Sequence, residues 1–200
     1  MKKIAVLISG GGSNLQSIID RIEDGCIKNA KIEVVISNKK DAYGLERAKK
    51  HGIEAVFSKD EKEIKKIILD RKCDLIVLAG FLKILSGDFL KEFKNKIINI
   101  HPSLIPSFCG MGYYGIKVHE AVVNYGVKIT GATVHFVEEE ADAGPIILQE
   151  AVEVSSSDTA DIVQKKVLEL EHRILPKVVD LFCQDLIDIN GRIVSIKEKK

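Results

Sequence analysis

Short apolar runs alternate with longer segments of helical periodicity through the first half of the chain. Five runs are typical of buried strands, at residues 4–8, 32–37, 55–57, 75–79 and 97–100. Between them lie four segments in which apolar residues recur at three and four positions, at residues 14–22, 42–51, 61–71 and 86–93. This alternation is typical of βαβ units. We therefore predict an α/β, Rossmann-like fold: a mostly parallel twisted sheet with helices on both faces.

The second half of the chain has a different pattern. Residues 118–123 indicate part of a helix, and residues 132–137 and 146–154 indicate two strands joined by an acidic loop at 138–145. Because consecutive strands joined by a short loop run antiparallel, we expect this pair to form an antiparallel edge of the sheet.

A long helix should follow these strands. Its predicted start is Ser157 or Asp158, where a Ser/Asp cap precedes periodic apolar residues. We expect it to run to about Phe182, with Pro176 as a kink or break because proline cannot donate a helical hydrogen bond.

The C-terminal segment 186–196 carries Asn190-Gly191 between two short alternating runs, which predicts a hairpin with a two-residue turn. No internal repeat, low-complexity segment or linker interrupts the sequence. We therefore expect residues 1–200 to form a single domain. We expect no additional domain, because the sequence begins at the first predicted strand and ends soon after the predicted hairpin.

Composition limits the classes of partner. The 200 residues are 46% hydrophobic, with a net charge of +1, and the lysine pairs are short and scattered, at Lys2-Lys3, Lys39-Lys40 and Lys199-Lys200. We therefore expect no nucleic-acid partner. The N-terminal apolar run is too short for a signal peptide, and no stretch is long enough to cross a bilayer, so we expect a cytoplasmic protein with no membrane partner. The four cysteines form no CxxC pair, which favours neither a zinc site nor a disulfide framework.

The first predicted strand leads directly into a glycine-rich turn, SGGGSN at residues 9–14. Glycines let backbone approach a ligand closely, and a following helix N-terminus favours an anion. The dinucleotide fingerprint is incomplete because its third glycine would fall at Leu15, and no acidic residue near Ser37-Asn38 could hold a ribose. A single phosphate is the better interpretation, although three glycines could also form no more than a tight turn.

Residues 99–106 read NIHPSLIP and follow a predicted central strand. The carboxyl ends of parallel strands are where ligands bind. Asn99 and His101 are two positions apart, so both side chains can face the same side. An amide donor and a titratable imidazole are the groups needed to stabilise an oxyanion and move a proton near pH 7. An Asn that caps a turn beside a His bonded to backbone would give the same pattern, so both interpretations stay open.

The loop 138–145 has four carboxylates in five residues, a composition usual for a solvated turn. Asp142 differs from the others because the following Gly144-Pro145 would fix the exit of the loop and hold this carboxylate in place. A held carboxylate beside an imidazole raises the pKa of that imidazole and can relay its proton.

Three further histidines need no catalytic role. We expect His135, midway along a predicted buried strand, to be a hydrogen-bonded core histidine. His51 and His119 lie in helical segments, and we expect them to face solvent or a loop.

Four segments, taken together and in order, resemble the folate-dependent formyltransferases. They are residues 9–15, 78–85, 99–106 and 133–145, and the resemblance covers essentially the whole chain. The combination of NIHPSLIP with a later Asp-x-Gly-Pro is highly specific, whereas the glycine turn alone is not. The resemblance implies transfer of the formyl group of 10-formyltetrahydrofolate to the amine of glycinamide ribonucleotide, a step of purine biosynthesis, with small molecules as the only partners.

The resemblance also implies roles for individual residues. Asn99, His101 and Asp142 match the catalytic trio of the family: the first two would stabilise the tetrahedral oxyanion, and Asp142 would set the charge of the histidine and help proton transfer through water. No metal is implied, and the chain could be a monomer or a homodimer. The substrate phosphate would be held by Gly12, Ser13 and Asn14, and the glycinamide would be contacted by Glu171. The folate cleft would be lined, largely through backbone, by Leu82, Lys83, Ile84, Leu85, Glu138, Glu139, Glu140, Ala141 and Asp142.

Two features depart from the family pattern. Lys83 stands where the family often has arginine, and residues 107–115, SFCGMGYYG, form a longer and more glycine-rich loop than expected. We expect Cys109 in that loop to be an ordinary thiol.

Competing functions remain to be separated. Formyltetrahydrofolate hydrolases and methionyl-tRNA formyltransferases use the same trio, but each would need an extra domain. A non-catalytic phosphometabolite sensor would need the glycine turn but not the trio. A nicotinamide-dependent reductase is disfavoured by the incomplete fingerprint.

Overall fold

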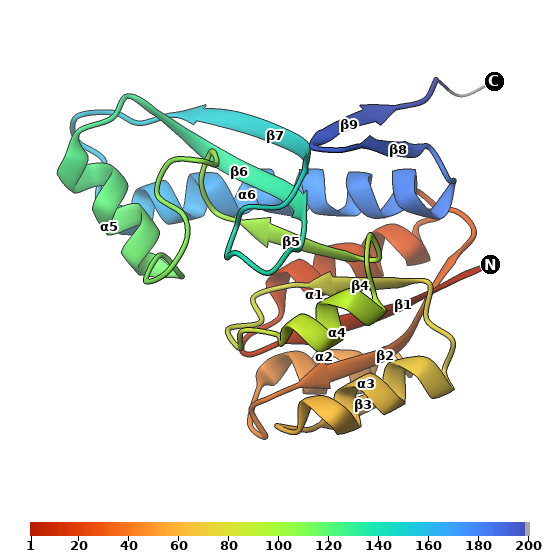
Figure 1. Cartoon of the computed structure of the whole chain (residues 1–200). Helices are drawn as coiled ribbons and strands as arrows, with labels where there is room; N and C mark the ends of the chain where they lie inside the picture. Colours follow the sequence, from red (N-terminus) through yellow and green to blue (C-terminus); the bar gives the residue numbers. More distant parts are fainter. Residues whose placement is uncertain (199–200) are drawn as a thin grey trace.

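A computed structural model describes residues 1–198, so the Lys199-Lys200 pair lies outside the described residues. The described strands form a seven-stranded sheet and a two-stranded hairpin (Figure 1). The strands are β1 (Lys2–Ile8), β2 (Ala30–Ser37), β3 (Ala55–Phe57), β4 (Leu75–Leu78), β5 (Ile97–His101), β6 (Ile129–Phe136), β7 (Ile146–Glu153), β8 (Ile187–Asn190) and β9 (Ile193–Ile196). The helices are α1 (Ser13–Glu23), α2 (Tyr43–Lys50), α3 (Glu61–Asp70), α4 (Gly87–Glu92), α5 (Ile116–Tyr125) and α6 (Ala160–Cys183).

The large sheet has the strand order β3-β2-β1-β4-β5-β6-β7. The first five strands in this order run parallel, whereas β6 is antiparallel to β5 and β7 is antiparallel to β6. The predicted parallel sheet with an antiparallel edge and a C-terminal hairpin is therefore confirmed. The strand order changes direction between β1 and β4, and the crevice at such a point is where open α/β sheets bind ligands.

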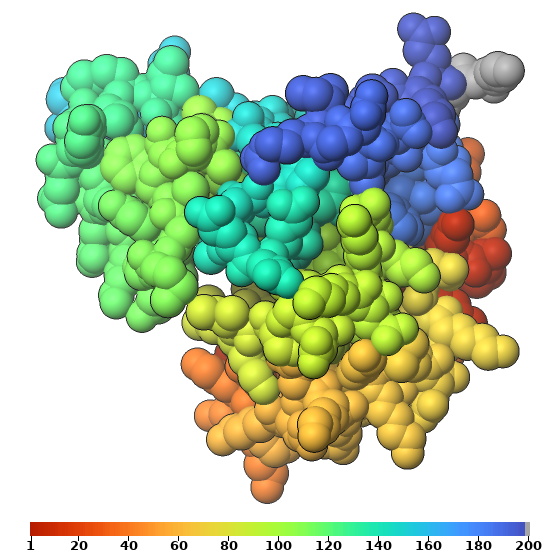
Figure 2. All heavy atoms as spheres, viewed as in Figure 1, coloured from red at the N-terminus to blue at the C-terminus, as the bar shows by residue number. Residues whose placement is uncertain are grey.

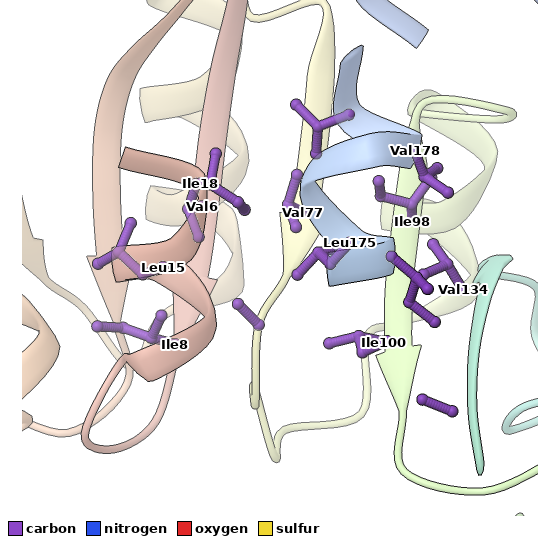
Figure 3. Close-up of a cluster of buried hydrophobic side chains, with 14 of the residues drawn as sticks. Val6, Ile8, Leu15, Ile18, Val77, Ile98, Ile100, Val134, Leu175 and Val178 are labelled. Carbon is purple, nitrogen blue, oxygen red and sulfur yellow. The ribbon is translucent and has the colours of Figure 1, made fainter. Parts of the chain in front are cut away.

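Alternating residues of the buried strands pack against different helices. On one face, Ile4, Val6 and Ile8 of β1 share a core with residues of α1, α2 and α6. On the other face, Ala5 and Leu7 share a core with residues of α3 and α4. Figure 3 shows the first core, where side chains of α1 and α6 meet those of β1, β4, β5 and β6. Both faces are thus covered, which is why these strands appear in the sequence as continuous apolar runs.

The long helix α6 differs from the prediction at its start. It begins at Ala160 and is capped by Thr159, whose side chain accepts a hydrogen bond from the N–H of Ile162. The predicted cap at Ser157 or Asp158 is wrong because the Asp158 carboxylate accepts from the Ser155 N–H and from Lys166 instead.

Of the kink or break predicted at Pro176, the break is absent, since α6 continues to Cys183 with Pro176 buried within it. No helix among residues 1–198 combines the length and apolar character needed to cross a membrane.

Candidate active site

The side chains of Asn99 and His101 lie near the carboxyl end of β5, on the same face of the sheet. The antiparallel register with β6 sets Asn99 opposite His135 and His101 opposite Thr133. Residues opposite each other in a sheet share a face. The Nδ2 atom of Asn99 lies 3.1 Å from Nε2 of His135, as this register requires.

Asp142 comes to these residues from the loop between β6 and β7. One carboxylate oxygen, Oδ1, lies 3.5 Å from Asn99 Nδ2 and 3.5 Å from His135 Nε2. The other, Oδ2, lies 3.4 Å from His101 Nδ1. The structure therefore brings together Asn99, His101 and Asp142, which the sequence placed in one trio.

The exit of this loop is fixed, as its Gly-Pro sequence predicts. The backbone at Gly144 lies so close to the Phe136 carbonyl that an added Cβ would be only 1.8 Å from its oxygen. The Phe136 N–H also donates to the carbonyl of Pro145. Because any side chain at position 144 would collide with backbone, only glycine allows this path, which holds Asp142 against the sheet.

The main chain of the loop at 107–115 completes the surroundings of the trio. The Phe108 carbonyl lies 2.9 Å from His101 Nε2, and the Gly110 N–H donates to Asp142 Oδ2 at 2.8 Å. Both ring nitrogens of His101 therefore face oxygen atoms that accept hydrogen bonds, an arrangement that suits the doubly protonated ring.

Opposing effects set the pKa values of His101 and Asp142. Burial lowers the pKa of His101 and outweighs the attraction of Asp142 and of the Phe108 carbonyl, which act to raise it. Asp142 thus acts to raise the pKa of His101, as expected from the sequence, but burial decides the net direction. For Asp142, burial acts to raise the pKa, but hydrogen bonding to His135 and the contacts with His101 and Gly110 lower it overall. A carboxylate paired with an imidazole that releases its proton easily can support proton transfer.

The three histidines that were expected to have no catalytic role divide into two groups. His135 is buried, and its Nδ1 lies 2.7 Å from the Phe136 carbonyl, as expected for a hydrogen-bonded core histidine. His51 is exposed, also as expected, and pairs with Glu23. The prediction that His119 faces solvent or a loop is wrong. This residue of α5 is only 2% exposed, and burial together with the nearby His101 lowers its pKa to about 4.

The glycine turn joins β1 to α1 and leaves backbone donors free. Gly12 has a φ of 72°, and a Cβ there would lie 2.8 Å from the Cα of Gly44 in α2. Within the described residues, the N–H groups of Ser13, Asn14 and Leu15 have no hydrogen-bond acceptor. Free N–H groups at the start of a helix form an anion site.

Glu171 of α6 reaches this turn from a distant part of the sequence. The Asn14 side chain donates a hydrogen bond of 2.6 Å to its carboxylate. Glu171 is 8% exposed, and burial raises its pKa to about 7, against the opposing effect of the Asn14 amide. The phosphate-site and glycinamide-site residues proposed from the sequence are therefore in direct contact.

The segment proposed for folate, residues 82–85, comes after β4 in the chain. Leu82 and Ile84 are exposed, whereas Leu85 is buried in the second core, so only its backbone is available to a ligand. The Leu82 N–H donates to the Ser9 hydroxyl, and the Lys83 ammonium donates to the Lys59 carbonyl.

The acidic loop contacts the loop at 107–115 through the hydrogen bond from the Gly110 N–H to Asp142. Figure 2 shows it in teal, on the same face of the molecule as the green loop that follows β5. The side chains of Glu138, Glu139 and Glu140 are exposed, as is Ala141. Within residues 1–198 there is no group of three or more His, Cys, Asp or Glu side chains arranged to hold a metal ion.

The main-chain groups of Phe108 and Gly110, each of which contacts a member of the trio, were not predicted from the sequence. Backbone contacts leave no trace in side-chain identity. The available signal was the run of glycines in the loop at 107–115, where Gly110 has a φ of 84°.

Comparison with known proteins agrees with this geometry. Residues 2–179 match the family described as formyl transferase. The chain is 42% identical to the phosphoribosylglycinamide formyltransferase of Haemophilus influenzae, covering 100% of this chain and 95% of that protein. It also matches the human trifunctional purine biosynthetic protein adenosine-3 at 40% identity, but spans only 20% of that longer protein.

Solved structures give the same result. The glycinamide ribonucleotide transformylase 1 of Symbiobacterium toebii has a TM-score of 0.92 and 40% identity, covering 99% of this chain and 95% of that one. A formyltetrahydrofolate deformylase from Pseudomonas syringae has a TM-score of 0.89 at 27% identity, with 98% of this chain and 66% of that chain covered. Because the family match extends over the glycine turn, β5, the acidic loop and most of α6, the chain belongs to the formyl transferase family.

Proposed function

We propose that this chain transfers the formyl group of 10-formyltetrahydrofolate to the amine of glycinamide ribonucleotide, giving formylglycinamide ribonucleotide and tetrahydrofolate in de novo purine biosynthesis. The observation that carries the proposal is the meeting of Asn99, His101 and Asp142 at the carboxyl end of β5. The similar H. influenzae and S. toebii proteins support the choice of substrates.

In the proposed reaction the acceptor amine attacks the formyl carbon, and the formyl oxygen becomes an oxyanion. Asn99 and protonated His101 donate hydrogen bonds to that oxygen. Asp142 stabilises the charge on His101 and, through water, helps move a proton from the attacking amine to the departing folate nitrogen. A carbon–nitrogen bond forms and another breaks, so no oxidant or reductant is needed. Because the Phe108 carbonyl occupies His101 Nε2 in this structure, it has to move if that nitrogen is to reach the substrate.

The acceptor binds at the glycine turn between β1 and α1. Gly12, Ser13 and Asn14 bind the ribonucleotide phosphate through free N–H groups, and Glu171 contacts the glycinamide. Folate lies along the exposed segment at 82–85 and the acidic loop at 138–142. Residues 1–200 act as one domain with small-molecule partners, in the cytoplasm, as a monomer or a homodimer.

A formyltetrahydrofolate hydrolase is the second candidate, since a deformylase has a similar fold. A hydrolase would use water in place of the amine and would have no need for an acceptor site. The buried contact between Asn14 and Glu171 beside a free helix N-terminus favours the transferase.

The two functions are separated by one assay. Purified protein is mixed with 10-formyltetrahydrofolate, or a 10-formyl-dideaza analogue, with and without glycinamide ribonucleotide, and deformylation is followed by absorbance. The transferase proposal predicts deformylation only when the ribonucleotide is present. Deformylation without it would establish a hydrolase, and no reaction under either condition would contradict both candidates.

A further inference from the structure

We propose that Arg47 is a positioning residue of the phosphate site: it holds the glycine turn in shape and supplies positive charge beside the substrate phosphate. The inference rests on the proposed function, because that function places the ribonucleotide phosphate at this turn. Arg47 lies in α2, 36 positions from the residue of the turn that it contacts.

Three contacts fix the Arg47 side chain. Its Nε donates to the Gly11 carbonyl at 2.8 Å, and its Nη1 donates to Gln16 Oε1 at 3.2 Å. The guanidinium also lies over the ring of Tyr43, 5.0 Å from its centroid. A side chain already held in place loses little further conformational freedom when an anion arrives, which favours binding.

Helix α2 also occupies two backbone carbonyls of the glycine turn with hydrogen-bond donors. A free carbonyl would repel a phosphate, but the Gly10 carbonyl accepts from the Gly44 N–H at 3.1 Å and the Gly11 carbonyl accepts from Arg47. The close approach of Gly12 to Gly44 holds the two segments together. The turn therefore presents N–H groups to a ligand, because α2 occupies its carbonyls.

Among the described residues, the Arg47 guanidinium has no carboxylate within ion-pair distance. Its two hydrogen bonds go to uncharged groups. Phosphate groups bind well to arginine because its charge is permanent and its donors are held in a fixed plane.

A cavity of about 250 Å3 opens beside the turn and includes the Arg47 side chain. It is lined by Ser13, Gln16, Ser17, Asp20, Arg47 and His172. Burial and the nearby Arg47 charge lower the pKa of His172, so this histidine is neutral at neutral pH. Of the side chains lining this cavity, Arg47 therefore carries the positive charge, and Asp20 is the acidic one.

Two variants of Arg47 and one control test the inference. Arg47→Met removes the charge and both hydrogen bonds, whereas Arg47→Lys keeps a charge but loses the planar fork. Lys50→Met is the matched control: it removes an exposed cation of the same helix, 5.5 Å from the same Tyr43 ring, with no contact to the glycine turn. For each protein we would measure kcat, the KM of both substrates, and competitive inhibition by inorganic phosphate.

We expect Arg47→Met to raise the acceptor KM and the phosphate inhibition constant by about ten-fold or more, with kcat and the donor KM little changed. Arg47→Lys should give intermediate values, and Lys50→Met should match the wild type. Unchanged phosphate inhibition in Arg47→Met would overturn the inference, as would an equal loss of kcat and of both substrate affinities. If Arg47→Met does not fold, Arg47→Lys decides, and a wild-type phosphate inhibition constant there would refute the positioning role.

The outcome is separable from the proposed function. A wild-type protein with no formyl transfer to the ribonucleotide would refute that function. Thermal-shift titration of wild type and Arg47→Lys with inorganic phosphate would then still decide whether Arg47 serves an anion site. Equal phosphate affinities in the two proteins would contradict it.

Discussion

The side chain of Asn14 donates a hydrogen bond to Glu171 across 157 positions of sequence, and the two residues join the glycine turn to the long helix α6. The carboxylate is buried, and its pKa is raised from its ordinary value of 4.5 to about 7. Glu171 is therefore protonated and neutral in the folded protein below neutral pH. Above neutral pH it is ionised, and a buried charge there destabilises the fold.

This contact predicts a pH dependence of stability. Between pH 4.5 and about 7, folded Glu171 holds a proton that the unfolded chain has released, so the free energy of unfolding falls as pH rises. The contribution is about 3 kcal/mol at most. In Glu171→Gln this contribution disappears, so urea unfolding at pH 5 and pH 8 should show a smaller difference than in the wild type. Identical differences in the two proteins would mean that Glu171 keeps its ordinary pKa.

The glycine turn predicts that two adjacent glycines differ in their tolerance of alanine. Gly12→Ala should cost about 1–3 kcal/mol of stability and raise the acceptor KM, because Gly12 has a positive φ and a Cβ there meets the backbone of Gly44. Gly11→Ala is the control, since no atom lies within 4 Å of a Cβ at that position. Thermal unfolding and acceptor kinetics measure both effects. Equal tolerance at the two positions would contradict the described turn.

The exposed apolar side chains after β4 predict an effect on the formyl donor. Leu82 and Ile84 are 55% and 65% exposed, so replacing both by Ser should leave stability within about 0.5 kcal/mol. If folate covers them, the KM of the donor should rise about ten-fold, with the acceptor KM unchanged.

A control for this pair comes from the hairpin. Ile193 in β9 is 73% exposed, and Ile193→Ser removes a comparable side chain away from the segment at 82–85. A donor KM that changes equally in the control and in the double variant would rule out a specific contact with folate.

Removing the His101 imidazole should lower the rate of formyl transfer rather than the affinity for substrate. His101→Ala should lower formyl transfer by about 10²–10⁴-fold, because the protonated imidazole donates a hydrogen bond to the oxyanion in the proposed reaction. Calorimetric titration should show acceptor affinity close to that of the wild type. If His101→Ala loses acceptor affinity but keeps the wild-type turnover at saturating substrate, His101 binds the acceptor and does not catalyse the transfer.

Much of the fold was predictable because burial on both faces leaves a strong pattern. Strands such as β1 and β4 are continuous apolar runs, and the helices between them have clear periodicity. The start of α6 was not predictable to the residue, since Ser157, Asp158 and Thr159 can all cap a helix. Only the folded chain shows that Lys166 and the Ser155 N–H occupy the Asp158 carboxylate.

The site was predictable where side-chain chemistry is concentrated in short motifs. Asn99 and His101 share a strand face by simple alternation, and Gly144 marks the loop that brings Asp142 to them. The burial of His119 was missed, although its spacing from Val118 and Val122 places all three on one stripe of α5. Helical periodicity counts a histidine as polar and cannot tell that this one packs near His101.

The most direct test of the central claim is the rate of formyl transfer by Asp142→Asn with both substrates saturating. The amide can still accept the hydrogen bond from the Gly110 N–H, so the loop and the fold should persist, but it carries no charge to stabilise protonated His101. We predict a fall in kcat of about 10²-fold or more, with little change in either KM. A kcat within about two-fold of the wild type would show that the trio at the end of β5 does not catalyse the transfer.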